Sequence, residues 1–210
     1  MWKNTIGGIV LISLTIAVVA RFKYGRAHNR WKWFLGYILS IIGLLFASSY
    51  PIENWFYSFS SIEALAQYAC DGELVLFVDG SDSCFIVCRT RSEKYSYMIS
   101  PKTESGYKIG RLSAHRELSK TVSMQYVVTI VQSDGSSDAY VLIGGLSAGQ
   151  CKGIQDSRNS SFVSETFPET PINGEPIVRI LASAYLGDHF DAPYEIGISD
   201  ANGTATVRFP

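Results

Sequence analysis

Residues 145–149 (GLSAG) match the G-x-S-x-G nucleophile elbow of serine hydrolases. In that elbow the serine lies on a sharp turn between a strand and a helix. A strand is expected over 140–144, but the residues after Gly149 carry no apolar helical stripe, and no His-Gly-Gly run supplies oxyanion donors. The pattern therefore favours a glycine-rich turn at the end of a strand over a hydrolase that uses Ser147.

His189 would complete such a triad, with Asp188 or Asp156 as its carboxylate. The same histidine lies in residues 187–191 (GDHFD), where an imidazole between two carboxylates could bind a divalent metal or tune a proton. Beyond residue 54 only His115 offers a second imidazole, and no zinc-type spacing of His and Cys is present. A solvated turn is the simpler interpretation. The sequence predicts no catalytic residue, no metal and no cofactor.

Two further segments, Asp134 to Asp138 and Asp200 to Asn202, resemble fragments of calcium loops. An EF-hand also needs a bidentate glutamate at a fixed distance, and neither segment has one. Both are interpreted as turns.

The cysteines are Cys70, Cys84, Cys88 and Cys151, and four cysteines allow three disulfide connectivities. Cys84 and Cys88 fall in one predicted strand, where four residues span about 13 Å, whereas a disulfide needs Cα atoms roughly 4.4–6.8 Å apart. This excludes the Cys84–Cys88 pair. Two connectivities remain, namely 70–84 with 88–151 and 70–88 with 84–151. Buried free thiols are the alternative to any bridge.

The segment that must position these residues, 55–210, is predicted to be a β-rich α+β domain. Ser60 with Glu63 forms a capping box ahead of apolar residues at helical spacing, so a short helix is expected over about 61–70. Short apolar runs separated by turn-forming groups then predict strands at 74–78, 84–90, 95–100, 107–111, 121–132, 138–144, 194–199 and 204–209. Because neighbouring strands are joined by tight turns, the sheet should be antiparallel.

Two stretches of this domain lack a clear pattern. Residues 145–176 are rich in Gly, Ser, Asn, Thr and Pro and lose hydrophobic periodicity, which predicts a long surface loop. Residues 177–186 form a short apolar run that periodicity alone cannot assign to strand or helix.

Residues 1–54 are predicted to form a transmembrane hairpin. Two uncharged apolar runs, 5–20 and 33–50, would cover about 24 and 27 Å as helices, close to a ~30 Å hydrocarbon core. The loop between them, 21–32, has no acid and five basic residues, which are Arg21, Lys23, Arg26, Arg30 and Lys32. Because positive charge is retained in the cytoplasm, this loop should determine the topology and place residues 55–210 outside. The expected localisation is the cell membrane, with two helices and an extracytoplasmic domain.

Two other interpretations of the apolar runs were weighed. A pair of buried core helices would usually keep a polar stripe, and these runs have none. A cleaved signal peptide over 1–20 is opposed by the basic run directly after the cut.

The charge of the chain is divided unevenly. Residues 1–54 hold six Lys or Arg and one acid, which leaves 12 basic and 18 acidic residues and a charge near −6 beyond them. Such a domain lacks the basic surface that binding to a phosphate backbone needs, so no nucleic acid is expected. The expected partners are the lipid bilayer and another envelope or membrane protein.

A capped helix (SSIEALAQY), a strand before a tight turn (LVLFVDGSDS), a strand (CFIVC) and a final GYKI strand follow one another between Ser60 and Ile109. This run resembles a layout that recurs in small, uncharacterised membrane-anchored proteins of Gram-positive bacteria. The resemblance implies location and fold, and it assigns no catalytic residue.

Together these features predict a membrane-anchored domain with a non-enzymatic binding or accessory role, acting through its sheet or through residues 145–176. One alternative is a small subunit of a larger membrane complex. Another is an enzyme, either a serine hydrolase using Ser147 or a metal site at Asp188, His189 and Asp191.

Overall fold

The computed structural model describes residues 19, 34–42, 54, 57–91, 94–110, 115–122, 126–133, 137–149, 151–172, 175–188, 190, 193–200 and 203–210. The chain divides into two compact units, Met1–Tyr57 and Ser58–Pro210.

In the first unit the described helix comprises the nine residues 34–42. No helix among the described residues is both long and apolar enough to cross a membrane. This finding contradicts the predicted transmembrane hairpin over 5–20 and 33–50, and with it the predicted two-helix membrane localisation. The five basic residues of the loop 21–32 lie outside the described residues.

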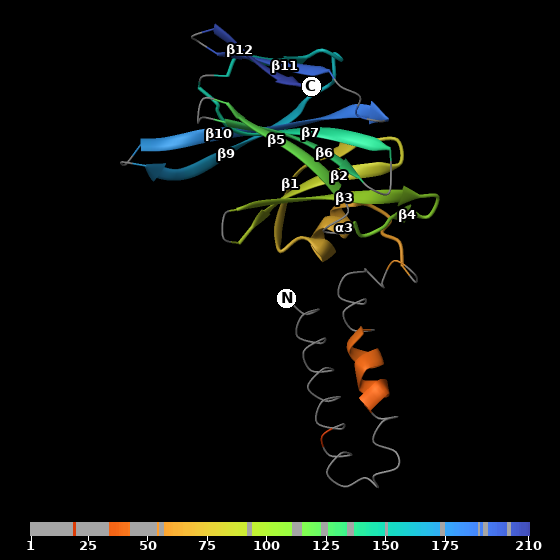
Figure 1. Ribbon diagram of the computed structural model, residues 1–210. Helices are drawn as coiled ribbons and strands as arrows, with labels where there is room; N and C mark the ends of the chain where they lie inside the picture. The colour runs from red at the N-terminus through yellow and green to blue at the C-terminus, as the bar shows by residue number, and fades with distance from the viewer. Residues whose placement is uncertain are drawn as a thin grey trace. The chain divides into compact units, whose positions relative to one another are not determined.

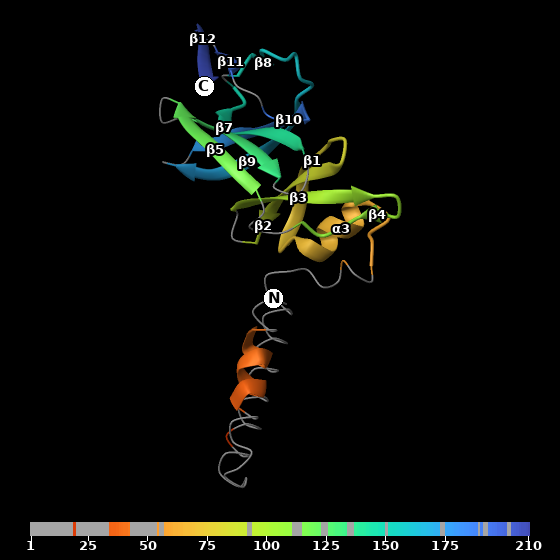
Figure 2. The same ribbon diagram turned by 45° about the vertical axis from the view of Figure 1, so that its right-hand side comes forward.

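In its described residues the second unit stacks one helix and three antiparallel sheets in four layers (Figures 1 and 2). The helix is α3 (Ile62–Ala69), and it covers the first sheet, formed by β1 (Gly72–Asp79), β2 (Ser83–Thr90), β3 (Tyr95–Thr103) and β4 (Gly106–Tyr107). The central sheet has the order β5-β6-β7-β10-β9, with β5 at His115–Val122, β6 at Tyr126–Ser133, β7 at Asp138–Ser147, β10 at Glu175–Asp188 and β9 at Val163–Ile172. The outer sheet has the order β12-β11-β8, with β12 at Gly203–Phe209, β11 at Tyr194–Asp200 and β8 at Gly153–Asp156.

Helix α3 occupies most of the stretch where the sequence predicts a helix, but its cap differs. The side chain of Ser61 accepts a hydrogen bond from the backbone N–H of Ala64, so Ser61, and not Ser60, is the N-cap. The helix ends at Cys70, whose N–H donates to the carbonyl of Ala66. Three side chains bury the inner face of the helix, namely Ile62, Leu65 and Ala66.

Strand β2 is buried on both faces from Cys84 to Cys88, which explains the apolar run CFIVC. Cys84, Ile86 and Cys88 pack in the cluster beneath α3. The alternate residues Phe85 and Val87 pack toward the central sheet. Because successive side chains of a strand point to opposite faces, a strand between two layers needs apolar residues at every position.

The central sheet corrects two predictions and resolves one that the sequence left open. The predicted strand 121–132 contains the end of β5 and most of β6, which pair as a hairpin. The run 177–186, which the sequence could not assign, belongs to strand β10. The predicted long loop 145–176 contains the end of β7 as well as β8 and β9. Strand β9 has the sequence VSETFPETPI, and its prolines are tolerated because it lies at the edge of the sheet. An edge strand of this kind lacks the apolar alternation that would identify it in a sequence.

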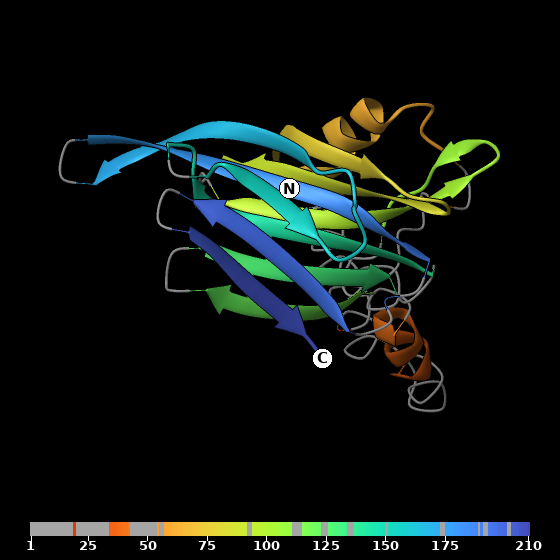
Figure 3. The same ribbon diagram turned by 90° about the horizontal axis from the view of Figure 1, so that it is seen from above.

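The outer sheet buries one face only, and its sequence alternates accordingly. In β11 the residues Tyr194, Ile196 and Ile198 are buried, whereas the residues between them are partly exposed. The buried side chains meet those of β6, β7 and β10 in the largest apolar cluster of the described structure. The outer sheet therefore covers the face of the central sheet that lies opposite the first sheet (Figure 3).

Candidate functional site

The serine of the G-x-S-x-G pattern, Ser147, is the last residue of β7. Its carbonyl accepts the N–H of Cys151, which closes a tight turn, and the next element is the strand β8, not a helix. The sequence prediction of a glycine-rich turn at a strand end agrees with this geometry. Gly145 adopts a φ of 90°, a left-handed conformation that glycine allows at low cost. The strand–turn–helix arrangement of a nucleophile elbow is not formed.

Of the proposed metal or triad cluster at 187–191, the structure describes the side chain of Asp188, whereas His189 and Asp191 lie outside the described residues. Asp156, the other carboxylate considered, is buried and accepts hydrogen bonds from the Ser160 N–H and the Tyr194 hydroxyl. It thus anchors the turn between β8 and β9. Across the described residues, no group of three or more His, Cys, Asp or Glu is placed to hold a metal ion.

The structure gathers six polar side chains from three segments far apart in the sequence, and we call them the polar seam. They are Ser81, Ser83, Asp138, Tyr140, Tyr185 and Asp188. The centre of the polar seam is Asp138, which is fully buried at the start of β7. Its Oδ2 accepts from the backbone N–H of Asp82 at 2.9 Å and from Ser83 Oγ at 2.7 Å.

Other contacts of the polar seam meet at the hydroxyl of Tyr185. The Tyr185 hydroxyl lies 3.0 Å from Asp138 Oδ1 and 2.5 Å from Asp188 Oδ1. It has a single proton to share between these two carboxylates. Ser81 Oγ donates to Asp188 at 3.0 Å, so the turn between β1 and β2 is tied to both β7 and β10. The polar seam is therefore a hydrogen-bonded clamp between the first and central sheets.

Burial raises the pKa of both tyrosines of the polar seam. It raises the pKa of Tyr140 well above its ordinary value, and it raises the pKa of Tyr185 to about 12 with help from the hydrogen bond to Asp188. Both phenols stay protonated near neutral pH and serve as donors. A Cβ at Gly80 would collide with the Tyr140 hydroxyl and the Asp138 carboxylate. Only glycine lets the β1–β2 turn lie this close to the polar seam.

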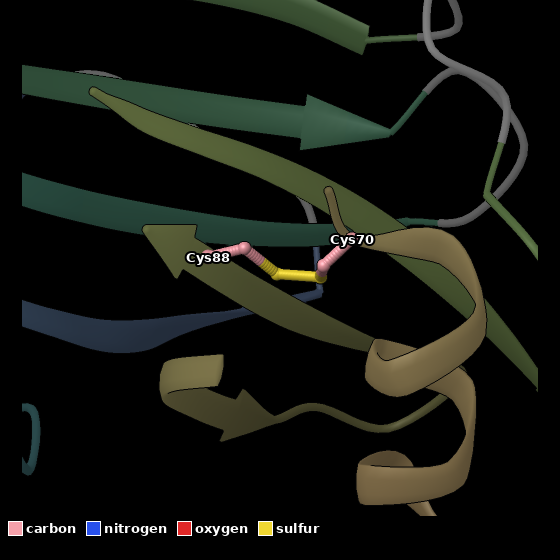
Figure 4. Close-up of a disulfide and its surroundings, with 2 residues drawn as sticks. All are labelled: Cys70 and Cys88. Atoms are coloured by element: carbon pink, nitrogen blue, oxygen red, sulfur yellow. A yellow bond between two sulfur atoms is a disulfide. The ribbon is translucent and has the colours of Figure 1, made fainter. Parts of the chain in front are cut away.

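The structure joins Cys70 at the C-terminal end of α3 to Cys88 in β2, with their Cα atoms 6.1 Å apart (Figure 4). This pair belongs to one of the two connectivities that the sequence left open. Its companion pair is not formed, and Cys84 and Cys151 are free. The reason is their layer, because Cys84 lies beneath α3 and Cys151 packs against the cluster on the far side of the central sheet.

We call residues 163–178 the β9–β10 arm. Pairing of β10 with β7 ends at Arg179 opposite Ser147, whereas pairing of β10 with β9 continues to Glu175 opposite Ile172. Beyond the pair Phe167–Arg179 the hairpin therefore projects past its neighbours in the central sheet (Figures 1 and 3), whereas Val163–Thr166 pair with the part of β10 that also pairs with β7. Its base is held by Phe167, whose ring lies 4.7 Å from that of Tyr95.

The polar seam and the arm could not be predicted from the sequence, for different reasons. Asp138 appeared in the sequence as half of a calcium-loop fragment, and nothing local indicates that a carboxylate at a turn is fully buried. The arm gave only a weak signal, since residues 163–178 contain three prolines but no apolar alternation. Prolines of this kind fit an edge strand as well as a loop.

No family model, no curated protein and no solved structure matches this chain. The candidate function therefore rests on the geometry of the described residues.

Proposed function

We propose that this chain is a non-enzymatic binding protein and that its β9–β10 arm contacts another protein. The observation that supports this most strongly is the exposure of β9 on both faces. Every side chain from Val163 to Thr166 is exposed, and so is Pro168. A strand normally offsets the entropy cost of its ordering by burying at least one face. A long strand that buries neither face over its first four residues contributes little to its own fold, which favours a role in contact with a partner.

The chemistry of the arm indicates the kind of protein that fits it. Residues 163–178 contain three glutamates and no lysine or arginine. Apolar side chains accompany this charge, and Val163 and Val178 are 43% and 44% exposed. The matching surface is apolar with a basic rim, so that rim charges speed association and the apolar contacts slow dissociation. Binding should weaken as salt is raised.

A photo-crosslinking amino acid placed in the arm tests this proposal. The full chain would carry it at Val163 or Val178, or at Thr206 on the exposed face of the outer sheet as the matched control. In the cells that make the protein, both arm positions should yield the same crosslinked partner and Thr206 should not. No adduct from either arm position, or equal adducts from Thr206, would overturn the proposal.

The chemistry of binding is tested separately by charge removal. Replacing Glu165 by Gln should lower the crosslinking yield at low salt and have less effect at high salt. The matched control is Glu195→Gln on the outer sheet, where Glu195 pairs with Arg208 at 2.8 Å. Equal effects of the two changes would argue against a basic partner while leaving the arm as the contact surface.

A further inference from the structure

Three of the four cysteines meet in one small apolar cluster beneath α3, which we call the α3 cluster. Cys84 and Cys88 are 0% and 2% exposed within it, and Cys70 packs against it at the end of the helix. Two of the three form the disulfide. The third, Cys84, is a free thiol on the same strand and the same face as Cys88.

A second polar group lies beside this thiol. Ser100 of β3 is directly opposite Cys84 of β2 in the ladder, and opposed residues of neighbouring strands share a face of the sheet. Ser100 is fully buried, and its Oγ has no hydrogen-bond partner among the described residues. Native structures rarely bury a hydroxyl without a partner, because its desolvation is then uncompensated. The Ser100 hydroxyl, which has no partner among the described residues, thus lies opposite the Cys84 thiol, which donates to the Phe85 carbonyl at 3.8 Å.

Helix α3 packs in one apolar cluster with Cys84, to which Phe59 and Ile109 also contribute. It has eight residues, and helices this short are marginal without tertiary contacts. Its hold on the sheet comes from three buried side chains and from the Cys70–Cys88 bond at its C-terminal end. Cys70 is only partly buried, so a thiol reductant can reach the bond from solvent. The free Cys84, by contrast, is shielded for as long as the helix stays in place.

We propose that Cys84 is a cryptic thiol-modification site that opens when the Cys70–Cys88 disulfide is reduced. Two equivalents of a small thiol reduce the bond, giving two cysteine thiols and one small-molecule disulfide. Because Cys84 lies four residues from Cys88 in the same strand, about 13 Å away, the whole short helix then has to lift to expose Cys84. Its thiolate attacks a low-molecular-weight disulfide, forms a mixed disulfide with one half and releases the other half as a thiol. The Ser100 hydroxyl lies beside the new sulfur atom as a donor.

The closed state protects the thiol in a second way. Burial, together with the negative charge of Asp79, raises the pKa of Cys84 to about 12. Since the thiolate is the nucleophile, a covered Cys84 is unreactive near neutral pH. Lifting α3 removes the burial that causes most of this shift.

The test measures the reaction of each cysteine with the disulfide 5,5′-dithiobis(2-nitrobenzoate), using the full chain and mass spectrometry of peptides. The wild type is compared with the double variant Cys70→Ser, Cys88→Ser, which mimics the opened bond without adding competing thiols. Labelling of Cys84 should accelerate roughly a hundredfold, the effect expected when a crosslink over such a short loop is lost. Cys151, which lies in another layer, should react at the same rate in both proteins.

Local opening is separated from global unfolding by repeating the labelling at low urea. Opening of one short helix exposes little surface, so the Cys84 rate should depend weakly on urea, whereas global unfolding follows the full denaturant dependence. Leu65→Ala, which loosens the helix with the disulfide intact, should also accelerate the labelling of Cys84. An unchanged Cys84 rate in the double variant, fast labelling in the oxidised wild type, or a full urea dependence would each overturn the proposal.

Discussion

The two faces of the first sheet are held in different ways. On one face, a helix of eight residues covers the α3 cluster and is fastened by one covalent bond. On the other face, the central sheet packs through a second apolar cluster and is fastened by the polar seam around Asp138. One fastening depends on the redox state of its surroundings. The other depends on protonated hydroxyl groups and buried carboxylate oxygens.

This difference indicates which layer can move. A buried carboxylate with several donors is costly to separate, because every group left behind is unsatisfied. A disulfide can be opened by a small thiol without disturbing the rest of the core. The interface between the first and central sheets should therefore be permanent, and α3 should be the layer that responds to conditions.

The largest effect is expected from Asp138→Asn. The amide has one acceptor oxygen where the carboxylate has two, so its NH2 must face either the Tyr185 hydroxyl or the Asp82 N–H and the Ser83 hydroxyl, which now donate to the carboxylate. With the charge also lost, the free energy of unfolding should fall by roughly 3–5 kcal/mol. Urea unfolding followed by circular dichroism measures the loss. The control is Asp79→Asn. The Asp79 side chain is 54% exposed and its carboxylate pairs with Lys102 at 2.8 Å, so this change should lower the free energy of unfolding by less than about 1 kcal/mol. Equal losses would mean that the polar seam does not hold the sheets together.

The next effect is expected from the double variant Cys70→Ser, Cys88→Ser. Loss of the 18-residue crosslink should lower the free energy of unfolding by about 2–4 kcal/mol. Hydrogen exchange should accelerate at the α3 amides much more than at those of β7. Cys151→Ser is the control and should change neither quantity. Uniform acceleration across both elements would show that the helix is not an independent layer.

A smaller effect is expected at the helix cap. Ser61→Ala removes the acceptor for the Ala64 N–H and should cost about 1 kcal/mol in urea unfolding. Ser60→Ala is the matched control, and it should cost only a few tenths of a kcal/mol as an ordinary surface change. If Ser60→Ala cost more stability than Ser61→Ala, Ser60 would be the N-cap.

The smallest effect concerns alkaline pH. Because the pKa of Tyr185 is raised from 10.0 to about 12 in the folded protein, its contribution to stability is fully present below pH 10 and is lost as the pH rises toward 12. Stability measured from pH 9 to 12 should therefore fall less steeply in Tyr185→Phe than in the wild type. Tyr68→Phe, on the exposed side of α3, is the control. Identical slopes for the wild type and Tyr185→Phe would refute the linkage.

The elements that could be predicted from the sequence are those with local signals. Helix α3 follows a serine cap and carries apolar residues at helical spacing. In the hairpin β11–β12, apolar and polar residues alternate along strands that are joined by a turn with Asn and Gly. Both signals lie within about ten residues, so no distant contact is needed to interpret them. The predictions for strand β9 and for the apolar N-terminal runs were wrong for opposite reasons. Strand β9 has no apolar pattern because it lies at the edge of its sheet. The N-terminal runs are apolar, but apolar composition does not by itself make a helix long enough to span a bilayer, and none is found among the described residues.

By itself the sequence determined that Cys84 and Cys88 cannot pair, because both lie in one extended strand. It also determined that residues 145–149 lack the helix a catalytic serine would need. Only the tertiary structure decided that Cys70 pairs with Cys88, that Asp138 is buried, and that β9 is exposed on both faces over Val163–Thr166. These facts depend on which layers stack against each other. Stacking is set by contacts between residues dozens of positions apart, and no local pattern encodes such contacts.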